Sequence, residues 1–221
     1  MACLSVTIIG LGQSGFTKDA VQLRVIHADP MTTKVSVQVD GATVSKVLKP
    51  RQSDSLELPP AIHTISLVDP ETSESITNTQ PITMRADHCY TFVIVRETTA
   101  PGSAIKPLIV PAECKPPEGS KANATFVLAA PSVEKVDVYA GWVKIISNLK
   151  RGEFEGPKTI PAGDYKVTAK EGSRLVLGPI ELSPKAGHSY TIVAFDNANS
   201  AAEGEQLTHR IYEDVFTTAS K

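Results

Sequence analysis

The sequence is poor in the features that mark several large classes of protein. It has three cysteines, Cys3, Cys89 and Cys114, too few for a disulfide-rich scaffold, and no C-x-x-C pair of the kind that binds zinc. Its longest apolar stretches, such as 92–95 and 108–110, are far too short to span a bilayer. Basic and acidic residues nearly balance, at 22 and 24, so no charge excess favours nucleic acid. We therefore expect a globular protein with no transmembrane segment and no nucleic-acid partner.

An export signal is also missing from the first residues. The N-terminus lacks a basic region, and residues 5–11 form only a short apolar run. No signal peptide is therefore visible, and the chain either takes another route or begins after a cleavage site.

The same region contains GLGQSG at residues 10–15, which matches the dinucleotide-binding motif G-x-G-x-x-G. That motif binds a cofactor only where the loop joins a strand to a helix of about three turns. Only residues 16–20 separate it from the next expected strand, whereas a βαβ crossover needs about a dozen residues or more. We therefore predict no cofactor site and interpret Gly10, Gly12 and Gly15 as a hinge.

Most of the chain consists of two copies of one unit. Three blocks recur in the same order: HCYTFVIV (88–95) as HSYTIVAF (188–195), LPPAIHTISL (58–67) as IPAGDYKVTA (160–169), and ADPMTTKVSVQVDG (28–41) as AAPSVEKVDVYAG (129–141). The offset stays between 100 and 102 and changes only between blocks, as expected when insertions lie in loops. This order indicates an internal duplication.

Both copies have the residue pattern of β-strands. Valines alternate with polar residues at 35–39 and again at 136–138, which predicts strands with one buried face. Residues 90–95 and 190–195 are more uniformly apolar, so we expect them to be central, well-covered strands. No stretch shows a helical period. The fold class we predict is all-β, with two tandem antiparallel β-sandwiches.

These patterns divide the chain into four parts. We predict an N-terminal arm at 1–20, a first sandwich at 21–113, a proline-rich linker at 114–123 and a second sandwich at 124–221. KPLIVPAE (106–113) is expected to be an edge strand, because proline is tolerated at sheet edges, and 207–216 is its counterpart.

Several of these blocks resemble the family called domain of unknown function 4397. LRVIHADPMTTKVSVQVDG and TFVLAAPSVEKVDVYAG are similar to its opening motif, although Ala129 replaces the motif's histidine in the second copy. LPPAIHTI, IPAGDYKV, ADHCYT, AGHSYT and KPLIVPAE resemble its later blocks. The resemblance covers roughly residues 21–216. It implies immunoglobulin-like sandwiches, often in tandem, in exported or cell-surface proteins, and it implies no catalytic residues.

Few residues suggest chemistry. His27 and Asp29 form an H-x-D that either binds a metal or makes a turn before a proline, and we favour the turn because the second copy keeps neither side chain. His88 and His188 recur at the start of a central strand, where a structural role is the more frequent one. We therefore predict no catalytic and no metal-binding residues.

Trp142 is the only tryptophan and follows an expected strand directly. Such a residue either stacks on a sugar or anchors a partner, or covers the end of the sandwich core. Cys89 and Cys114 belong to neighbouring strand ends, so they form either a disulfide bond or two buried thiols. Cys3 lies outside both repeats, and an odd cysteine there is a candidate for an intermolecular bridge.

The N-terminal arm suggests a mechanism of assembly. Leu4, Val6, Ile8 and Ile9 form a short β-prone segment that cannot fold alone but can pair with an open sheet edge of a neighbour. A head-to-tail contact of this kind builds a filament. Our first hypothesis is a non-enzymatic assembly subunit of a cell-surface or extracellular layer, filament or appendage. The alternative is a tandem surface binding module or adhesin that recognises a glycan or protein through its loops, with Trp142 as the anchor.

Overall fold

The regular structure of the chain is entirely β. The computed structural model describes residues 20–86, 88–113, 115–197, 204 and 206–214, and within them it contains eighteen strands and no helix. The predicted fold class is thereby confirmed. The predicted arm (Leu4, Val6, Ile8, Ile9), the predicted hinge (Gly10, Gly12, Gly15), Cys3 and Cys114 lie outside the described residues.

The first repeat is a sandwich of two four-stranded sheets with a small two-stranded sheet at one end. Its strands are β1 (Val21–His27), β2 (Ser36–Val39), β3 (Ala42–Thr43), β4 (Ser53–Leu58), β5 (Ile62–His63), β6 (Ile65–Val68), β7 (Ser75–Asn78), β8 (Ile82–Thr83), β9 (His88–Arg96) and β10 (Ile105–Glu113). The strand orders are β10-β9-β1-β4, which we call the first inner sheet, and β3-β2-β6-β7, the first outer sheet. Strands β5 and β8 pair with each other.

The second repeat has the same pair of four-stranded sheets. Its strands are β11 (Lys121–Leu128), β12 (Lys135–Ala140), β13 (Val143–Lys150), β14 (Phe154–Pro161), β15 (Tyr165–Glu171), β16 (Arg174–Leu182), β17 (Ser189–Asp196) and β18 (Leu207–Asp214). They form a second inner sheet, β14-β11-β17-β18, and a second outer sheet, β13-β12-β15-β16. The inner sheets match strand for strand, as the duplication predicts.

Most neighbouring strands are antiparallel, with one exception in each repeat. The opening strand of each copy pairs in parallel with the apolar strand, β1 with β9 and β11 with β17. The apolar strands are central, and β10 and β18 lie at sheet edges, as predicted. Pro107 and Pro111 in β10 are compatible with this place, because an edge strand needs no donor on its outer side.

The connection between the repeats is shorter than the sequence predicts. Strand β10 ends at Glu113 and β11 begins at Lys121, so residues 121–123 belong to a strand and not to the predicted linker. Gly119 adopts a positive φ of 66° just before β11. This conformation suits glycine and turns the chain directly into the second repeat.

Each sandwich has its own apolar core, and a third apolar cluster joins the two inner sheets. Ile26, Val93 and Val95 of the first repeat pack with Val127, Val193 and Phe195 of the second, and all are buried. These residues lie on the faces of the inner sheets that are turned away from the sandwich cores. The contact explains why β9 and β17 are apolar on both faces. The sequence predicts that these strands are covered but not that they cover each other.

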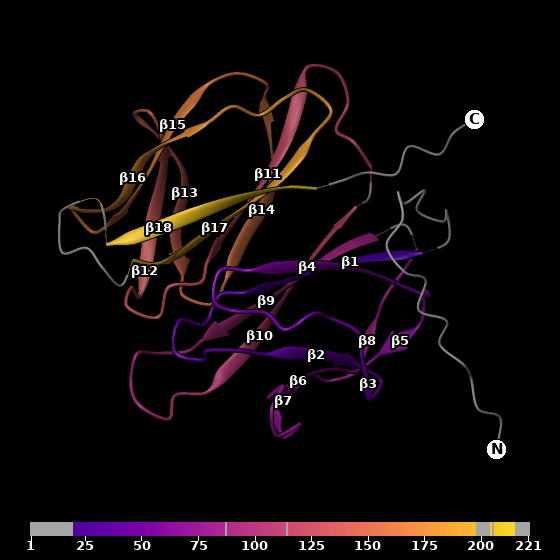
Figure 1. Cartoon of the computed structure of the whole chain (residues 1–221). Helices are drawn as coiled ribbons and strands as arrows, with labels where there is room; N and C mark the ends of the chain where they lie inside the picture. The colour runs from indigo at the N-terminus through magenta and orange to yellow at the C-terminus, as the bar shows by residue number, and fades with distance from the viewer. Residues whose placement is uncertain (1–19, 87, 114, 198–203, 205, 215–221) are drawn as a thin grey trace.

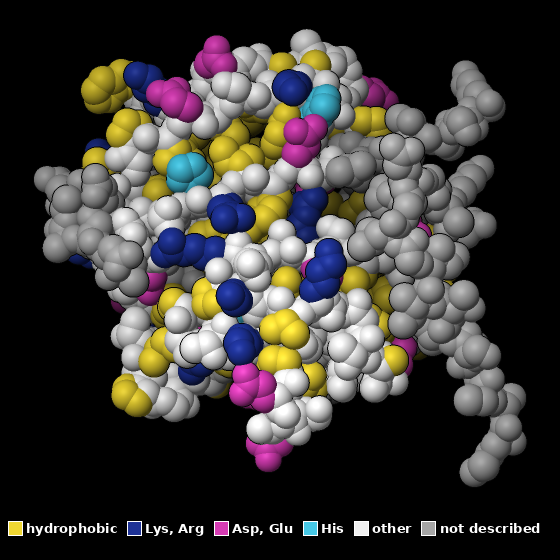
Figure 2. All heavy atoms as spheres, in the orientation of Figure 1, with side chains coloured by type: hydrophobic (Ala, Val, Ile, Leu, Met, Phe, Trp, Pro, Cys, Tyr) yellow, Lys and Arg dark blue, Asp and Glu magenta, His cyan; other side chains and the backbone are white. Residues whose placement is uncertain are grey.

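Charged groups surround this contact. The Arg24 guanidinium donates to Asp214 Oδ1 at 2.5 Å and to the carbonyl of Glu213 at 2.7 Å, and it lies 5.5 Å from the centre of the Tyr212 ring. Arg51 donates to the backbone oxygen of Asp196 at 2.7 Å. Strands of both repeats meet at this junction (Figure 1), and basic side chains gather along it (Figure 2). Polar contacts of the first repeat therefore fix the position of the second.

Phe195→Ala is expected to weaken both repeats, because its ring is 2% exposed between them. Loss of such a ring costs about 3–5 kcal/mol of unfolding free energy. We expect amide exchange to accelerate in β9 as well as in β17, measured by hydrogen–deuterium exchange in dilute urea. Phe126→Ala, within the second core alone, is the control and should affect β9 less. Equal effects of the two substitutions on amide exchange in β9 would contradict the conclusion that the contact at Phe195 stabilises both repeats.

Candidate functional site

A hairpin at one end of the second outer sheet carries Trp142, the most exposed large hydrophobic residue among those the structure describes. Strands β12 and β13 pair up to Ala140 and Val143, and Gly141 turns the chain between them with a φ of 57°. Trp142 follows in the turn and is 100% exposed, and Val143 is 66% exposed. Of the two interpretations left open by the sequence, covering the core is therefore wrong. The indole is free to contact a partner.

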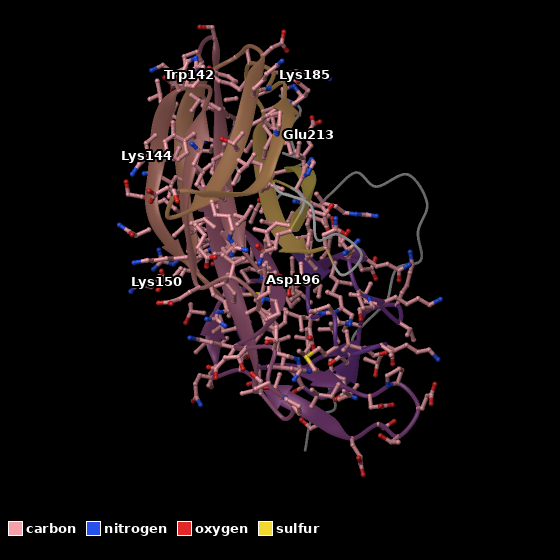
Figure 3. All side chains as sticks on the ribbon, turned by 90° about the vertical axis from the view of Figure 1, so that its left-hand side faces the viewer. Trp142, Lys144, Lys150, Lys185, Asp196 and Glu213 are labelled. Atoms are coloured by element: carbon pink, nitrogen blue, oxygen red, sulfur yellow. The ribbon has the colours of Figure 1, made fainter. Side chains whose placement is uncertain are left out.

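Lysines accompany this tip along the outward side of the sheet. In Figure 3, Trp142 lies at one end of the second repeat, and Lys144 and Lys150 extend from the same side. Alternation along the strands directs apolar residues such as Val138 and Val167 into the core and leaves the intervening polar residues outside. The lysines on this side are Lys135, Lys144, Lys150, Lys166 and Lys170. We call them, with Tyr139 among them, the lysine face.

Tyr139 lies between two of these lysines. Its ring centre is 5.7 Å from Lys144 Nζ and 5.2 Å from Lys170 Nζ, within the range of cation–π attraction. The strand registers produce this cluster. Tyr139 stands opposite Lys144 in β13 and opposite Thr168 in β15, and Lys170 lies two residues after Thr168 on the same face of the sheet. The β12–β13 hairpin and the later strand β15 thus place an aromatic ring and two ammonium groups together.

The lysine face contains two carboxylates. Asp137 accepts from Lys144 Nζ at 2.6 Å and from the backbone nitrogen of Asn148 at 2.8 Å. Both bonds, that of Lys144 first, lower the pKa of Asp137, and the bond to Asp137 raises the pKa of Lys144. Glu181 lies 3.9 Å from Lys166. Asp137 therefore stays ionised and compensates one lysine.

The first outer sheet shows that the fold does not require these residues. Its corresponding positions follow from the same register, since Gln38 stands opposite Thr43 and opposite Ser66. Where the second repeat has Tyr139, Lys144 and Thr168, the first has these three uncharged residues. The cluster of Tyr139, Lys144 and Lys170 is therefore a property of one repeat, whereas Lys135 and Lys150 have counterparts in Lys34 and Lys49.

His27 and Asp29, the H-x-D of the sequence, form a buried turn. Asp29 accepts from Arg96 Nε and Nη2, both at 2.8 Å, from the backbone nitrogen of Met31 at 3.0 Å and from Thr32 Oγ1 at 2.5 Å. Burial alone would raise the pKa of Asp29, but these hydrogen bonds together hold it below its usual value. The side chain thus has the structural role expected of it.

His27 is fully buried beside this turn. Its Nε2 lies 2.9 Å from the carbonyl of Thr32, to which a neutral imidazole donates, and Nδ1 has no partner among the described residues. Burial lowers the pKa of His27. Where the structure is described, no three metal-ligating side chains approach one another closely enough to hold an ion.

The position of Arg96 is occupied by a residue of opposite charge in the second repeat. Asp196 ends β17 as Arg96 ends β9, and it accepts from Ser132 Oγ at 2.5 Å. Burial raises the pKa of Asp196, and the hydrogen bonds from Ser132 and the charges of Arg151 and Arg51 offset only part of that rise. The two copies therefore place their end charges in different electrostatic environments.

The two recurring histidines open the strands β9 and β17. The His188 ring stacks on Tyr190 with centres 6.3 Å apart, and Nδ1 lies 2.5 Å from Glu213 Oε1. The His88 ring stacks on Tyr90 at 6.2 Å. Each histidine thus contacts residues of its own sheet, and these contacts give both a structural role.

Cys89 is disulfide-bonded. The other cysteines of the chain, Cys3 and Cys114, both lie outside the described residues, so the pairing of Cys89 with Cys114 stays a prediction. Strand register places Ala112 opposite Cys89, two residues before Cys114 in the sequence.

A cleft of about 220 Å³ lies between the repeats and is lined by Arg96, Lys106 and Arg151. Its guanidinium groups already have partners. Arg96 donates to Asp29 and to the carbonyl of Ser103, and Arg151 donates to the carbonyl of Pro131. The cleft therefore offers few free donors, and the lysine face with Trp142 is the stronger candidate site.

Comparison with known families gives two matches to one family model. The model described as a domain of unknown function (DUF4397) matches residues 21–139 and residues 122–218. Curated protein sequences yield no match. No helix among the described residues is long and apolar enough to cross a membrane.

Asp29→Asn is expected to destabilise the fold at pH 7, whereas Asp196→Asn is not. Ionised Asp29 stabilises the fold above about pH 4, and this contribution is lost as the pH falls through its lowered pKa. Removal of its charge leaves Arg96 unpaired and costs about 3 kcal/mol. Asp196 has a raised pKa, so its contribution is largest when it is protonated and is lost as the pH rises. Its neutral replacement should be tolerated or stabilising.

Urea unfolding at pH 7 and pH 3 measures both variants. The deficit of Asp29→Asn should shrink at the lower pH. Equal destabilisation by the two substitutions at pH 7 would contradict this assignment.

Proposed function

The chain belongs to the DUF4397 family as a tandem protein, and we propose that it is a non-enzymatic surface binding module that recognises a glycan through its second repeat. The observation that carries the proposal is the complete exposure of Trp142 at the tip of the β12–β13 hairpin. An indole exposed to water contributes none of the favourable free energy that burial of its large apolar area would give. A bound partner restores that gain.

A sugar suits this tip in shape and chemistry. The apolar face of a pyranose ring packs on an aromatic face, and its hydroxyl groups need neighbouring donors and acceptors. Lys144 and the exposed backbone of the hairpin supply these beside Trp142. Val143 extends the apolar surface by one residue.

The disulfide bond of Cys89 supports a place at the cell surface or outside the cell. Disulfide bonds persist in oxidising compartments and are rare where glutathione keeps thiols reduced. Ser189 occupies the same position in the second repeat, so the bond is an addition to the shared fold.

The environments of the shifted carboxylates support a function without catalysis. Asp29 is held by Arg96, Asp196 by Ser132, and Asp214 by Arg24. Burial raises the pKa of Asp214 beyond what Arg24 offsets. Each group serves a turn or the contact between repeats, whereas catalytic groups with shifted pKa values usually face an open site.

Trp142→Ala is expected to weaken glycan binding by at least about tenfold, as loss of a central aromatic anchor does. Binding is measured on an array of neutral and acidic polysaccharides and then by biolayer interferometry. The thermal unfolding midpoint should not change, because the indole contacts solvent only.

Ile62→Ala is the matched control, since this large apolar residue is 66% exposed in the first repeat. The proposal is wrong if Trp142→Ala binds as well as the unchanged chain, or if no glycan binds.

A second candidate function is assembly by strand addition, and one feature of β18 favours it. This edge strand has eight residues, no proline or glycine, and an unbroken register with β17. The outer side of such a strand offers backbone donors and acceptors to an added strand. The arm that contains Leu4, Val6, Ile8 and Ile9 is the proposed donor, with the hinge glycines before β1 and Cys3 as a covalent lock.

Deletion of residues 2–14 is expected to abolish any oligomer if the arm donates a strand. Oligomeric state is measured by size-exclusion chromatography with light scattering, and assemblies are viewed by electron microscopy. Cys3→Ser is the control, because it removes only the covalent lock and should leave assembly intact under reducing conditions. A deletion variant that assembles as well as the full chain would exclude this mechanism.

A further inference from the structure

We propose that the glycan is acidic: a linear polysaccharide with carboxylate or sulfate groups that lies across the lysine face, with one sugar on Trp142. This rests on the glycan-binding function proposed above and specifies the chemical class of the ligand.

The lysine face is positively charged, although the whole chain is not. It contains five lysines and the two carboxylates of Asp137 and Glu181, whereas the chain has a net charge of −2. Glu171 and Arg174 at its corner pair with each other and add no charge. The excess is therefore local, and it complements a negatively charged partner.

Three of the lysines form no ion pair with a carboxylate among the described residues. Asp137 pairs with Lys144 and Glu181 lies near Lys166, which leaves Lys135, Lys150 and Lys170 without an ion pair. Lys135 and Lys150 also stand directly opposite each other on β12 and β13. Like charges in this position destabilise a sheet. An anionic ligand would relieve the repulsion and supply the missing partners.

Tyr139 directs two of the ammonium groups. Lys144 and Lys170 both lie over its ring, so their positions are constrained before a ligand arrives. Groups that are already ordered lose less conformational entropy on binding than free side chains do.

The extent of the face favours a polymer over a membrane. Lys144 and Lys150 stand opposite Tyr139 and Lys135, which are four residues apart on β12, and this corresponds to roughly 13 Å along the sheet. If Trp142 entered a bilayer, Lys150 and Lys135 would lie farther from the headgroups than the screening length of about 8 Å. A chain of acidic sugars can instead meet every lysine along this length.

The first repeat provides an internal comparison. Its outer sheet has Gln38 and Thr43 where the second has Tyr139 and Lys144, and Val68 where the second has Lys170. The same fold thus forms without these groups. Their presence in one copy is therefore consistent with a role in binding and is not needed for folding.

A matched pair of triple variants tests the proposal in the full chain. The first replaces the unpaired lysines, Lys135→Gln, Lys150→Gln and Lys170→Gln. The second removes the same charge elsewhere, with Lys49→Gln, Lys106→Gln and Lys185→Gln, at exposed lysines without ion pairs among the described residues. Binding to polygalacturonate, dextran sulfate and uncharged dextran is measured by biolayer interferometry between about 50 and 300 mM salt.

We expect the unchanged chain to bind the two acidic polymers and not dextran, with an affinity that falls as salt increases. The first triple variant should lose at least about tenfold in affinity and most of its salt dependence, and the second less than about twofold. Trp142→Ala should weaken binding but keep the salt dependence. The melting temperature of the first triple variant should not fall, since it removes the opposed Lys135–Lys150 pair.

Other results would overturn the proposal in distinguishable ways. Binding of dextran as tightly as the acidic polymers, without salt dependence, would refute the acidic ligand and leave glycan binding intact. Equal loss in both triple variants would show attraction by net charge alone. Binding to phosphatidylglycerol vesicles without binding to acidic polymers would identify a membrane as the partner. Absence of binding to every polysaccharide would refute both proposals.

Discussion

The apolar contact between the inner sheets determines which surfaces the molecule can expose. Because β9 and β17 are buried on both faces, neither inner sheet is available to a partner. The outer sheets, the hairpin tips and the sheet edges remain. Both proposed functions use these surfaces, since the glycan site lies on an outer sheet and a tip, and the assembly site is an edge strand.

The duplication separates what the fold needs from what one repeat has added. Apolar residues recur at the same strand positions in both copies, as Val37 and Val138 do, because each sandwich must fill a similar core. Outward positions are free of that constraint, and here the copies differ, with Gln38 in one and Tyr139 in the other. The added residues on the second outer sheet are therefore the ones that call for a functional explanation.

Alternating valines, uniformly apolar strands and a proline-containing edge were sufficient to predict the all-β class, the central places of β9 and β17 and the edge places of β10 and β18, but not the parallel pairing of β9 with β1 and of β17 with β11. Asp29 could be assigned to a turn because proline follows it directly. The lysine face could not be predicted, because Tyr139, Lys144 and Lys170 meet only through the register of three strands. The contact between the inner sheets around Phe195 could not be predicted either. Apolar residues indicate that a strand is covered, but they do not indicate which element covers it. The exposure of Trp142 could not be predicted either, because it depends on the direction in which the turn between β12 and β13 projects.

Covalent connection of the repeats has a consequence for symmetry. A homodimer of single repeats joined through the same sheets would have to carry identical residues at every pair of positions that its two-fold axis relates. One chain has no such obligation, and it ends β9 with Arg96 and the matching strand β17 with Asp196. The seven residues between β10 and β11 also keep the halves at high effective concentration, whatever the abundance of the protein. Fusion thus allows each half to diverge while the pair stays together.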